Sequence, residues 1–158
     1  MKPISPAQYA ALMTRNAAVV EDRVQDALAR AAGQGAKLAR QQTREVDRVD
    51  TGRFAEGWKS EARDDVGGAA VYNDAQHAPY VDDGRRAGGA PPPIGALVRW
   101  VERRLGLGGD HAWAVARTIS RRIAARGIVG AQIAKWLGDK LKPIARAEVE
   151  KELRELVR

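Results

Sequence analysis

The sequence predicts a mostly helical α+β fold with a long N-terminal helix, a small antiparallel sheet built on a β-hairpin, and several C-terminal helices. Apolar residues recur at helical spacing through residues 5–47. Two short strand-like runs follow, joined by an Asp-Asp-Val-Gly-Gly turn. Further helical patterns separated by glycine-rich breaks fill the rest of the chain. The length of 158 residues favours a single domain over 1–158.

The first predicted helix covers residues 5–47. Ser5 is a favourable N-cap, and Pro6 at the first helical position loses no hydrogen bond that the helix needs. Such a helix is about 60 Å long at about 1.5 Å per residue. This exceeds the width of a compact domain of this size, so part of the helix is expected to lie against another subunit. Gly33 and Gly35 weaken its middle and could mark a kink.

Residues 50–84 are predicted to form the small sheet and its junction with the helices. A short helical turn carries Phe54, the only phenylalanine. Residues 57–64 and 69–73 read as the two strands of a β-hairpin. The stretch 71–84 then leaves the second strand, turns, and ends in an acidic pair followed by glycine.

The C-terminal part begins with a flexible Gly/Pro arm over residues 85–93. A helical insertion at 94–126 follows, with two helices separated by a glycine-rich turn and Asp110 as the cap of the second. The C-terminal helix occupies 131–158. Pro143 is expected to kink or divide it. Acids and bases alternate near the end of this helix, as is typical of an exposed helix.

The positive charge of the chain is confined to one segment. The formal net charge is +7. Residues 1–84 carry 11 Lys/Arg against 13 Asp/Glu, residues 85–126 carry 9 against 2, and residues 127–158 carry 7 against 5. All nine basic residues of the middle segment are arginines, which favour bidentate contacts with carboxylates and phosphates. Either an acidic protein surface or a nucleic-acid backbone fits such a segment.

The arginines of this segment lie on the polar faces of its two predicted helices. Only Glu102 and Asp110 are acidic there, so carboxylate partners must come from residues 1–84 of the same subunit or of the next one. Single-stranded nucleic-acid binding usually adds aromatic stacking, but Trp100 and Trp113 adjoin apolar faces and are expected to pack. Non-specific DNA contact stays open. The arginines are Arg99, Arg103 and Arg104 on the first helix and Arg117, Arg121 and Arg122 on the second.

No pattern in the chain predicts catalysis, a cofactor or a metal. There is no cysteine, so no thiol nucleophile or cysteine metal site exists. His77 and His111 sit in no cluster with metal-ligand spacing, and no nucleophile elbow or phosphate loop occurs. Asp74, Asp82 and Asp83 form the only acidic cluster, yet neighbouring residues on a helix point apart, and metal sites draw ligands from several elements. A metal-dependent nuclease or toxin-like enzyme at this cluster is the distant alternative.

The sequence also predicts a soluble, intracellular protein. No apolar run approaches the roughly 18 residues that a membrane span needs. The N-terminus, Met1-Lys2-Pro3-Ile4-Ser5-Pro6, lacks the apolar core of a signal peptide.

The order of several short motifs points to a family. These motifs are Val49-Asp50-Thr51-Gly52-Arg53-Phe54, a strand from Trp58, Val71-Tyr72-Asn73, and Ala78-Pro79-Tyr80-Val81-Asp82-Asp83-Gly84. Over residues 5–135 the sequence resembles the tailed-bacteriophage neck and tail-completion family typified by the tenth gene product of a lambda-like coliphage. It departs from that pattern at Asp82, where glutamate is common, and at Pro79-Tyr80, which alter the local spacing. Residues 94–126 look like the helical insertion of some members.

The resemblance implies a structural virion protein and not an enzyme, with no cofactor. Such proteins form a six-fold or twelve-fold ring at the head–tail junction, around the DNA channel, between head-completion or adaptor proteins and tail-terminator or tail-tube proteins. They assemble in the host bacterial cytoplasm. Head-to-tail packing would bring the acidic part of one subunit to the basic part of the next. The alternative is a DNA-binding or packaging accessory protein that uses the arginine helices. The residues expected to contact neighbours are Asp82, Asp83, Arg85, Arg86, Arg99, Arg103, Arg117, Arg121 and Arg122.

Overall fold

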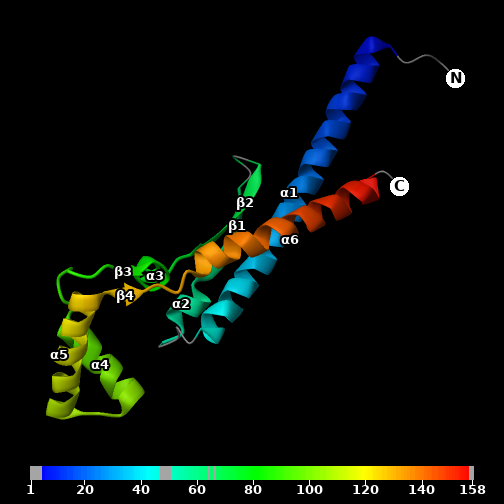
Figure 1. The fold of residues 1–158 in the computed structure, drawn as a ribbon. Coiled ribbons are helices and arrows are strands. Elements are labelled where there is room, and N and C mark those ends of the chain that lie inside the picture. The colour runs from blue at the N-terminus through cyan, green and yellow to red at the C-terminus, as the bar shows by residue number, and fades with distance from the viewer. Residues whose placement is uncertain (1–4, 47–50, 64, 66, 157–158) are drawn as a thin grey trace. The chain divides into compact units, whose positions relative to one another are not determined.

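A computed structural model describes residues 5–46, 51–63, 65 and 67–156 (Figure 1). It confirms the predicted fold class, a mostly helical α+β fold with a long N-terminal helix, and adds a second small sheet. By its internal contacts the chain divides into two compact units. The first unit comprises Met1–Ala39, Trp58–Tyr72 and Lys135–Arg158, and the second comprises Arg40–Gly57 and Asn73–Ala134. The expectation of a single domain stays a prediction.

Helix α1 (Pro6–Glu45) begins where the sequence predicts and runs without a break through Gly33 and Gly35. Its first turn is closed by a reciprocal pair of hydrogen bonds. The Ser5 N–H donates to Oε1 of Gln8 at 2.9 Å, and the Gln8 N–H donates to Oγ of Ser5 at 3.3 Å. Two backbone donors that the helix leaves unpaired are thereby satisfied, which fixes the start of α1.

Helix α6 (Ile133–Leu156) is the other long helix, and its part within the first unit lies along α1 (Figure 1). The surface of α1 there is built from small residues, and Ala27 and Ala31 are almost completely buried. A Cβ added to Gly35 would lie 2.7 Å from Cδ2 of Leu141 on α6. Small residues thus let the two helices approach closely. The helix continues through the exposed Pro143, so this proline does not divide it, and the predicted alternative of a kink there stays a prediction.

The predicted hairpin is formed by β1 (Trp58–Arg63) and β2 (Gly68–Asn73), whose strands pair with each other. Trp58 begins β1 and is 3% exposed. From α1, the Gln25 side-chain amide donates to the carbonyl oxygen of Gly68 at 2.6 Å. The hairpin is therefore held to the long helix at the start of β2.

A second sheet, which the sequence analysis missed, lies in the second unit. Strand β3 (Gly84–Arg85) pairs antiparallel with β4 (Ile128–Val129), so that Gly84 lies opposite Val129. Residues 127–130 were predicted only as a break between helices. Two-residue strands have no periodic pattern for sequence analysis to find. Gly84 has φ +81, and a Cβ added to it would collide with the Ile128 carbonyl oxygen, so no side chain fits there.

The remaining elements of the second unit are helical, and the α4–α5 pair has a core of its own. Val101, Ala112 and Ala116 are fully buried in it, and Trp100 packs against it as predicted. Trp113 is 45% exposed, because the register of α5 turns Ala112 and Ala116 inward, so its predicted packing is wrong. These helices are α2 (Arg53–Glu56), α3 (Ala78–Asp82), α4 (Ile94–Leu105) and α5 (Gly109–Arg126).

The arm at 85–93 is tied to α5 by two hydrogen bonds. The Gly88 N–H donates to the Ala124 carbonyl at 2.7 Å, and the Ser120 hydroxyl donates to the Pro92 carbonyl at 2.9 Å. Whether the arm is flexible stays a prediction.

At the other end of α5, Gly108 is the N-cap and Asp110 lies in the first turn, so the prediction that Asp110 caps the helix is wrong.

Candidate subunit-contact surfaces

The motif residues on both sides of the hairpin meet at Asn73. Its side-chain amide donates to the Phe54 carbonyl at 2.7 Å, and its Oδ1 accepts the Ala75 N–H at 3.0 Å. A Cβ on Gly57 would collide with that Oδ1, so glycine is required there. The end of β2 is thereby joined to α2, which explains why these short motifs occur together. Val49-Asp50 of the first motif lies outside the described residues.

Asp82, one of the predicted contact residues, caps a helix inside its own subunit. Its Oδ1 accepts the Ile133 N–H at 2.6 Å and its Oδ2 accepts the Ala134 N–H at 3.1 Å. The residue before α6 is Gln132, whose φ of +54 is left-handed. The first donors of α6 are therefore satisfied by a carboxylate from α3, and a negative charge at a helix N-terminus is favourable. Asp82 is only 8% exposed.

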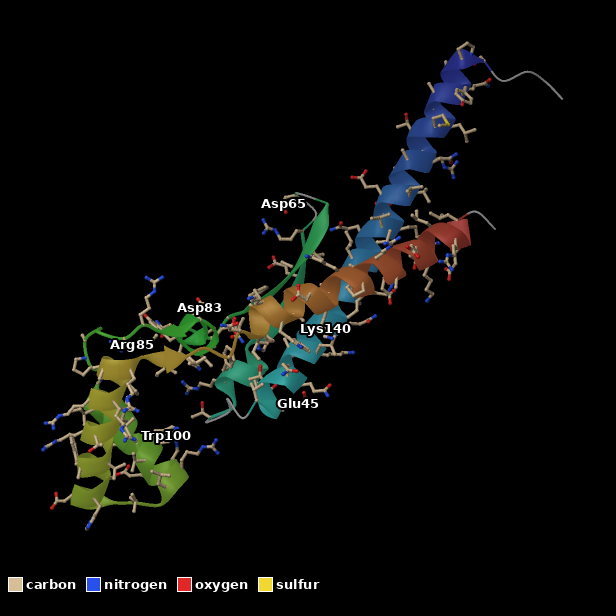
Figure 2. All side chains as sticks on the ribbon, viewed as in Figure 1. Glu45, Asp65, Asp83, Arg85, Trp100 and Lys140 are labelled. Carbon is tan, nitrogen blue, oxygen red and sulfur yellow. The ribbon has the colours of Figure 1, made fainter. Side chains whose placement is uncertain are left out.

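The four residues around Gly84 that were predicted to form a contact surface separate into two kinds. Asp82 is buried and Arg85 is half-buried in β3, where its guanidinium donates to the Ala90 carbonyl. Asp83 and Arg86 are exposed. Asp83 and Arg85 flank Gly84, and both are labelled in Figure 2. Asp83 and Arg86 are thus the two available to a neighbour, although contact by any of the four stays a prediction.

The arginines predicted on α4 and α5 are all exposed, as Figure 2 shows for the many nitrogen-tipped side chains around this pair. They lie away from the buried core of the pair, on the outer helix faces. Among the described residues, four of them form no ion pair within the chain: Arg99, Arg117, Arg121 and Arg122. Their charge therefore remains available to carboxylates or phosphates of another molecule.

A second charged cluster, which the sequence analysis missed, joins α1 to α6 in the first unit. Glu152 is 6% exposed and pairs with Arg23 at 3.4 Å and also with Arg30. Glu148 accepts from Gln34 at 2.8 Å and from Arg30 at 3.3 Å. The alternating charges near the end of α6 were predicted to be exposed, and for Glu152 this is wrong. The sequence signal for this cluster is the spacing of its members. Arg23 and Arg30 are seven residues apart on α1, and Glu148 and Glu152 are four residues apart on α6, so each pair shares one face of its helix.

This cluster shifts the protonation of its members. The hydrogen bond from Gln34, and next that from Arg30, lowers the pKa of Glu148 below its usual value. The hydrogen bond to Glu148 is the largest cause that raises the pKa of Arg30. The pairing is therefore fully charged at neutral pH, and it weakens only in acid.

The described residues offer no arrangement suited to metal chemistry. No group of three or more His, Cys, Asp or Glu side chains among them is placed to hold a metal ion. The His77 ring lies 6.3 Å from the Phe54 ring, centroid to centroid, which is a packing contact.

Over the same described residues, every helix is too short or too polar to cross a membrane.

Comparison with known proteins gives one family. Residues 9–84 match the family model described as "Bacteriophage HK97-gp10, putative tail-component". The match begins in α1, includes the Asn73 cluster and Asp82, and ends at the first residue of β3. The α4–α5 pair and α6 lie beyond it. Neither the curated proteins nor the solved structures give a match.

Proposed function

Through residues 9–84 the chain belongs to the HK97-gp10-like family of phage tail components, and from this premise we propose that it is a structural subunit of a ring at the head–tail junction. The ring joins the head-completion or adaptor side to the tail terminator or tail tube, and DNA passes through its centre. Six or twelve copies close it. Its work is mechanical and requires no catalytic group, cofactor or metal.

The separation of charge along the chain carries this proposal. Residues 85–126 hold a net charge of +7, and residues 1–84 hold −2. The positive side chains stand on the outer faces of α4 and α5, where the core of the pair leaves them exposed. In a ring, each subunit presents two different surfaces to its two neighbours. Opposite charges on these surfaces speed assembly and exclude wrong pairings.

The same arginines favour a second candidate function, contact with DNA. Guanidinium groups bind phosphate oxygens bidentately, and such contacts need no sequence-specific readout. A DNA-binding or packaging accessory protein would use the exposed faces of α4 and α5 in this way. The two functions differ in whether the arginine faces are covered by protein or by nucleic acid.

Ring formation is tested by replacing three arginines of α5 at once. Arg117→Gln/Arg121→Gln/Arg122→Gln removes three positive charges from the exposed face of α5. A matched control, Lys135→Gln/Lys140→Gln/Lys142→Gln, removes the same charge from exposed positions on α6. Native mass spectrometry and electron microscopy are expected to show rings for the wild type and the lysine variant, and loss of rings for the arginine variant. Equal assembly of both variants would contradict the proposal that these faces join subunits.

Binding to duplex DNA distinguishes the second candidate. If α5 binds phosphates, the slope of log K against log salt falls by about 0.9 for each lost phosphate contact in the arginine variant. The lysine variant would keep the wild-type slope. Strong DNA binding of this kind by a chain that forms no ring would favour the accessory role over the structural one.

A further inference from the structure

The first four turns of α1, residues 6–20, have an unusual composition for a helix surface. Every residue of this segment is exposed. Charged residues make up 30% of the whole chain, yet Arg15 is the only one here. A helix that is apolar on most sides is normally buried. The segment is therefore suited to burial against partners that the isolated subunit does not supply.

The segment has two faces that differ in size. A step of about 100° per residue places them about half a turn apart. On one face the exposed fractions are 57% for Tyr9, 51% for Met13 and 40% for Val20. The small face follows a spacing of four, three and four residues, and Tyr9, Met13, Asn16 and Val20 of the large face repeat this spacing. The large face consists of Tyr9, Leu12, Met13, Asn16, Val19 and Val20, and the small face of Ala7, Ala11, Thr14 and Ala18.

The part of α1 that follows this segment along the chain already packs small residues against a neighbouring helix. Ala27 and Ala31 are buried, and Gly35 lies so close to Leu141 that even a Cβ would meet its side chain at 2.7 Å. The large face of residues 6–20 continues into this stripe at Ala27. The contacts with α6 reach Arg23, and α1 continues past the end of α6 in Figure 1. The apolar surface thus extends beyond the helix that covers it.

We propose that residues 6–20 pack against the same segment of a second copy of this chain, the large face of one copy against the small face of the next. Because the two faces differ, the contact is heterologous. Each copy binds one neighbour through its large face and the other neighbour through its small face. Such a contact repeats from copy to copy, and it closes into a ring when the rotation between neighbouring copies divides a full turn. The inference rests on the proposed function and names the surface that joins neighbouring subunits.

The size of the surface explains why the contact belongs to an assembly. The segment is ~22 Å long and a helix is ~10 Å wide. One such face is smaller than the roughly 800 Å² per partner that a stable complex buries. A single contact is therefore weak. A closed ring, in which every helix makes two contacts and the charged faces add to them, is stable.

Disulfide trapping tests the pairing directly, because the chain has no cysteine of its own. Ala11 and Met13 lie on opposite faces of the same helical turn, so a ring without axial rise brings Met13 of one copy to Ala11 of the next. The double variant Ala11→Cys/Met13→Cys, oxidised at assembly concentration, is expected to give a ladder of linked multimers on a non-reducing gel. Each single variant is expected to give monomers. Thr14→Cys/Met13→Cys tests the adjacent register.

The outcomes separate this inference from the proposed function. Dimers from Met13→Cys alone would mean that large faces meet each other, and would overturn the inference. Rings visible by microscopy without a ladder from either double variant would overturn it too, while leaving the proposed function intact. A ladder from a protein that is absent from the head–tail junction would support the pairing and refute the location. Neither rings nor a ladder would refute both.

A charge placed on each side of the segment gives an independent readout. Leu12→Lys puts a cation on the large face and is expected to abolish ring formation. Ala10→Lys puts the same cation between the two faces and is expected to leave rings intact. Circular dichroism checks that both variants keep their helices. Equal assembly of the two would contradict the inference.

Discussion

Replacing Asp82 with alanine is expected to destabilise the second unit, because the carboxylate of Asp82 holds the start of α6. The two bonds, from the Ile133 N–H at 2.6 Å and the Ala134 N–H at 3.1 Å, are charge-assisted, and Asp82 is 8% exposed. An ordinary N-cap residue replaced by alanine costs about 1 kcal/mol, and a hydrogen bond to a charged group contributes about 1.5–3 kcal/mol. The bond from the Ile133 N–H is buried, so water cannot replace it in the variant. The free energy of unfolding should therefore fall by about 2–4 kcal/mol.

Asp83→Ala is the matched control, because it removes the same charge one residue later from an exposed position. It should change the free energy of unfolding by less than about 0.5 kcal/mol. Asp82→Asn keeps one acceptor oxygen and should fall between the two. Urea unfolding followed by circular dichroism gives the free energies. Hydrogen exchange at the Ile133 and Ala134 amides reports the cap itself, and protection there should be lost only in the Asp82 variants.

Equal stability of Asp82→Ala and Asp83→Ala, with both amides still protected, would refute the assignment of Asp82 as an internal cap. An Asp82 variant that keeps full stability but cannot form rings would show that Asp82 contacts a neighbouring subunit, as predicted from the sequence.

Three further variants test other parts of the fold. Gly84→Ala should lower the free energy of unfolding by about 3 kcal/mol, because φ is +81 and the Ile128 carbonyl leaves no room for a Cβ. The control Gly138→Ala, at an open position of α6, should raise the free energy of unfolding by about 0.5–1 kcal/mol. Urea unfolding measures both variants. Asn73→Ala should cost about 2 kcal/mol by the same measurement, since it removes the bond to the Phe54 carbonyl and the acceptor for Ala75. Glu148→Gln should reduce the loss of stability in acid, because the pKa of Glu148 is lowered in the fold, chiefly by Gln34 and then by Arg30. The stabilisation by the Glu148 carboxylate is present above the unfolded pKa of about 4.3 and is lost as the pH falls through the lower folded pKa. Thermal unfolding between pH 3 and pH 7 measures this, and an unchanged acid slope in the variant would contradict it.

The sequence predicts elements that repeat a pattern over several turns. Helix α1 has both a regular apolar spacing and a Ser-Pro start, and its observed bounds, Pro6–Glu45, lie within two residues of the prediction. The hairpin has two strands and a glycine turn between them. The α4–α5 pair shows its inward face through Val98 and Val101 on α4. In each case the signal is local and does not require knowledge of distant contacts.

The parts that could not be predicted depend on residues far apart in the chain. The bonds from Asp82 reach 51 and 52 residues along the sequence to the start of α6. The β3–β4 pair has two residues in each strand, too few for any periodicity. Glu152 is buried only because Arg23 and Arg30 of α1 lie against α6. Neighbouring acids such as Asp82 and Asp83 are alike in sequence, and only the fold makes one a cap and leaves the other exposed.

Imaging of the assembled phage particle tests the central claim most directly. We expect a closed ring of this chain at the head–tail junction, with six or twelve copies around the DNA channel and the N-terminal segments of α1 side by side between neighbours. A particle in which the chain lies elsewhere, or in which single copies occupy the junction without contacting each other, would contradict it.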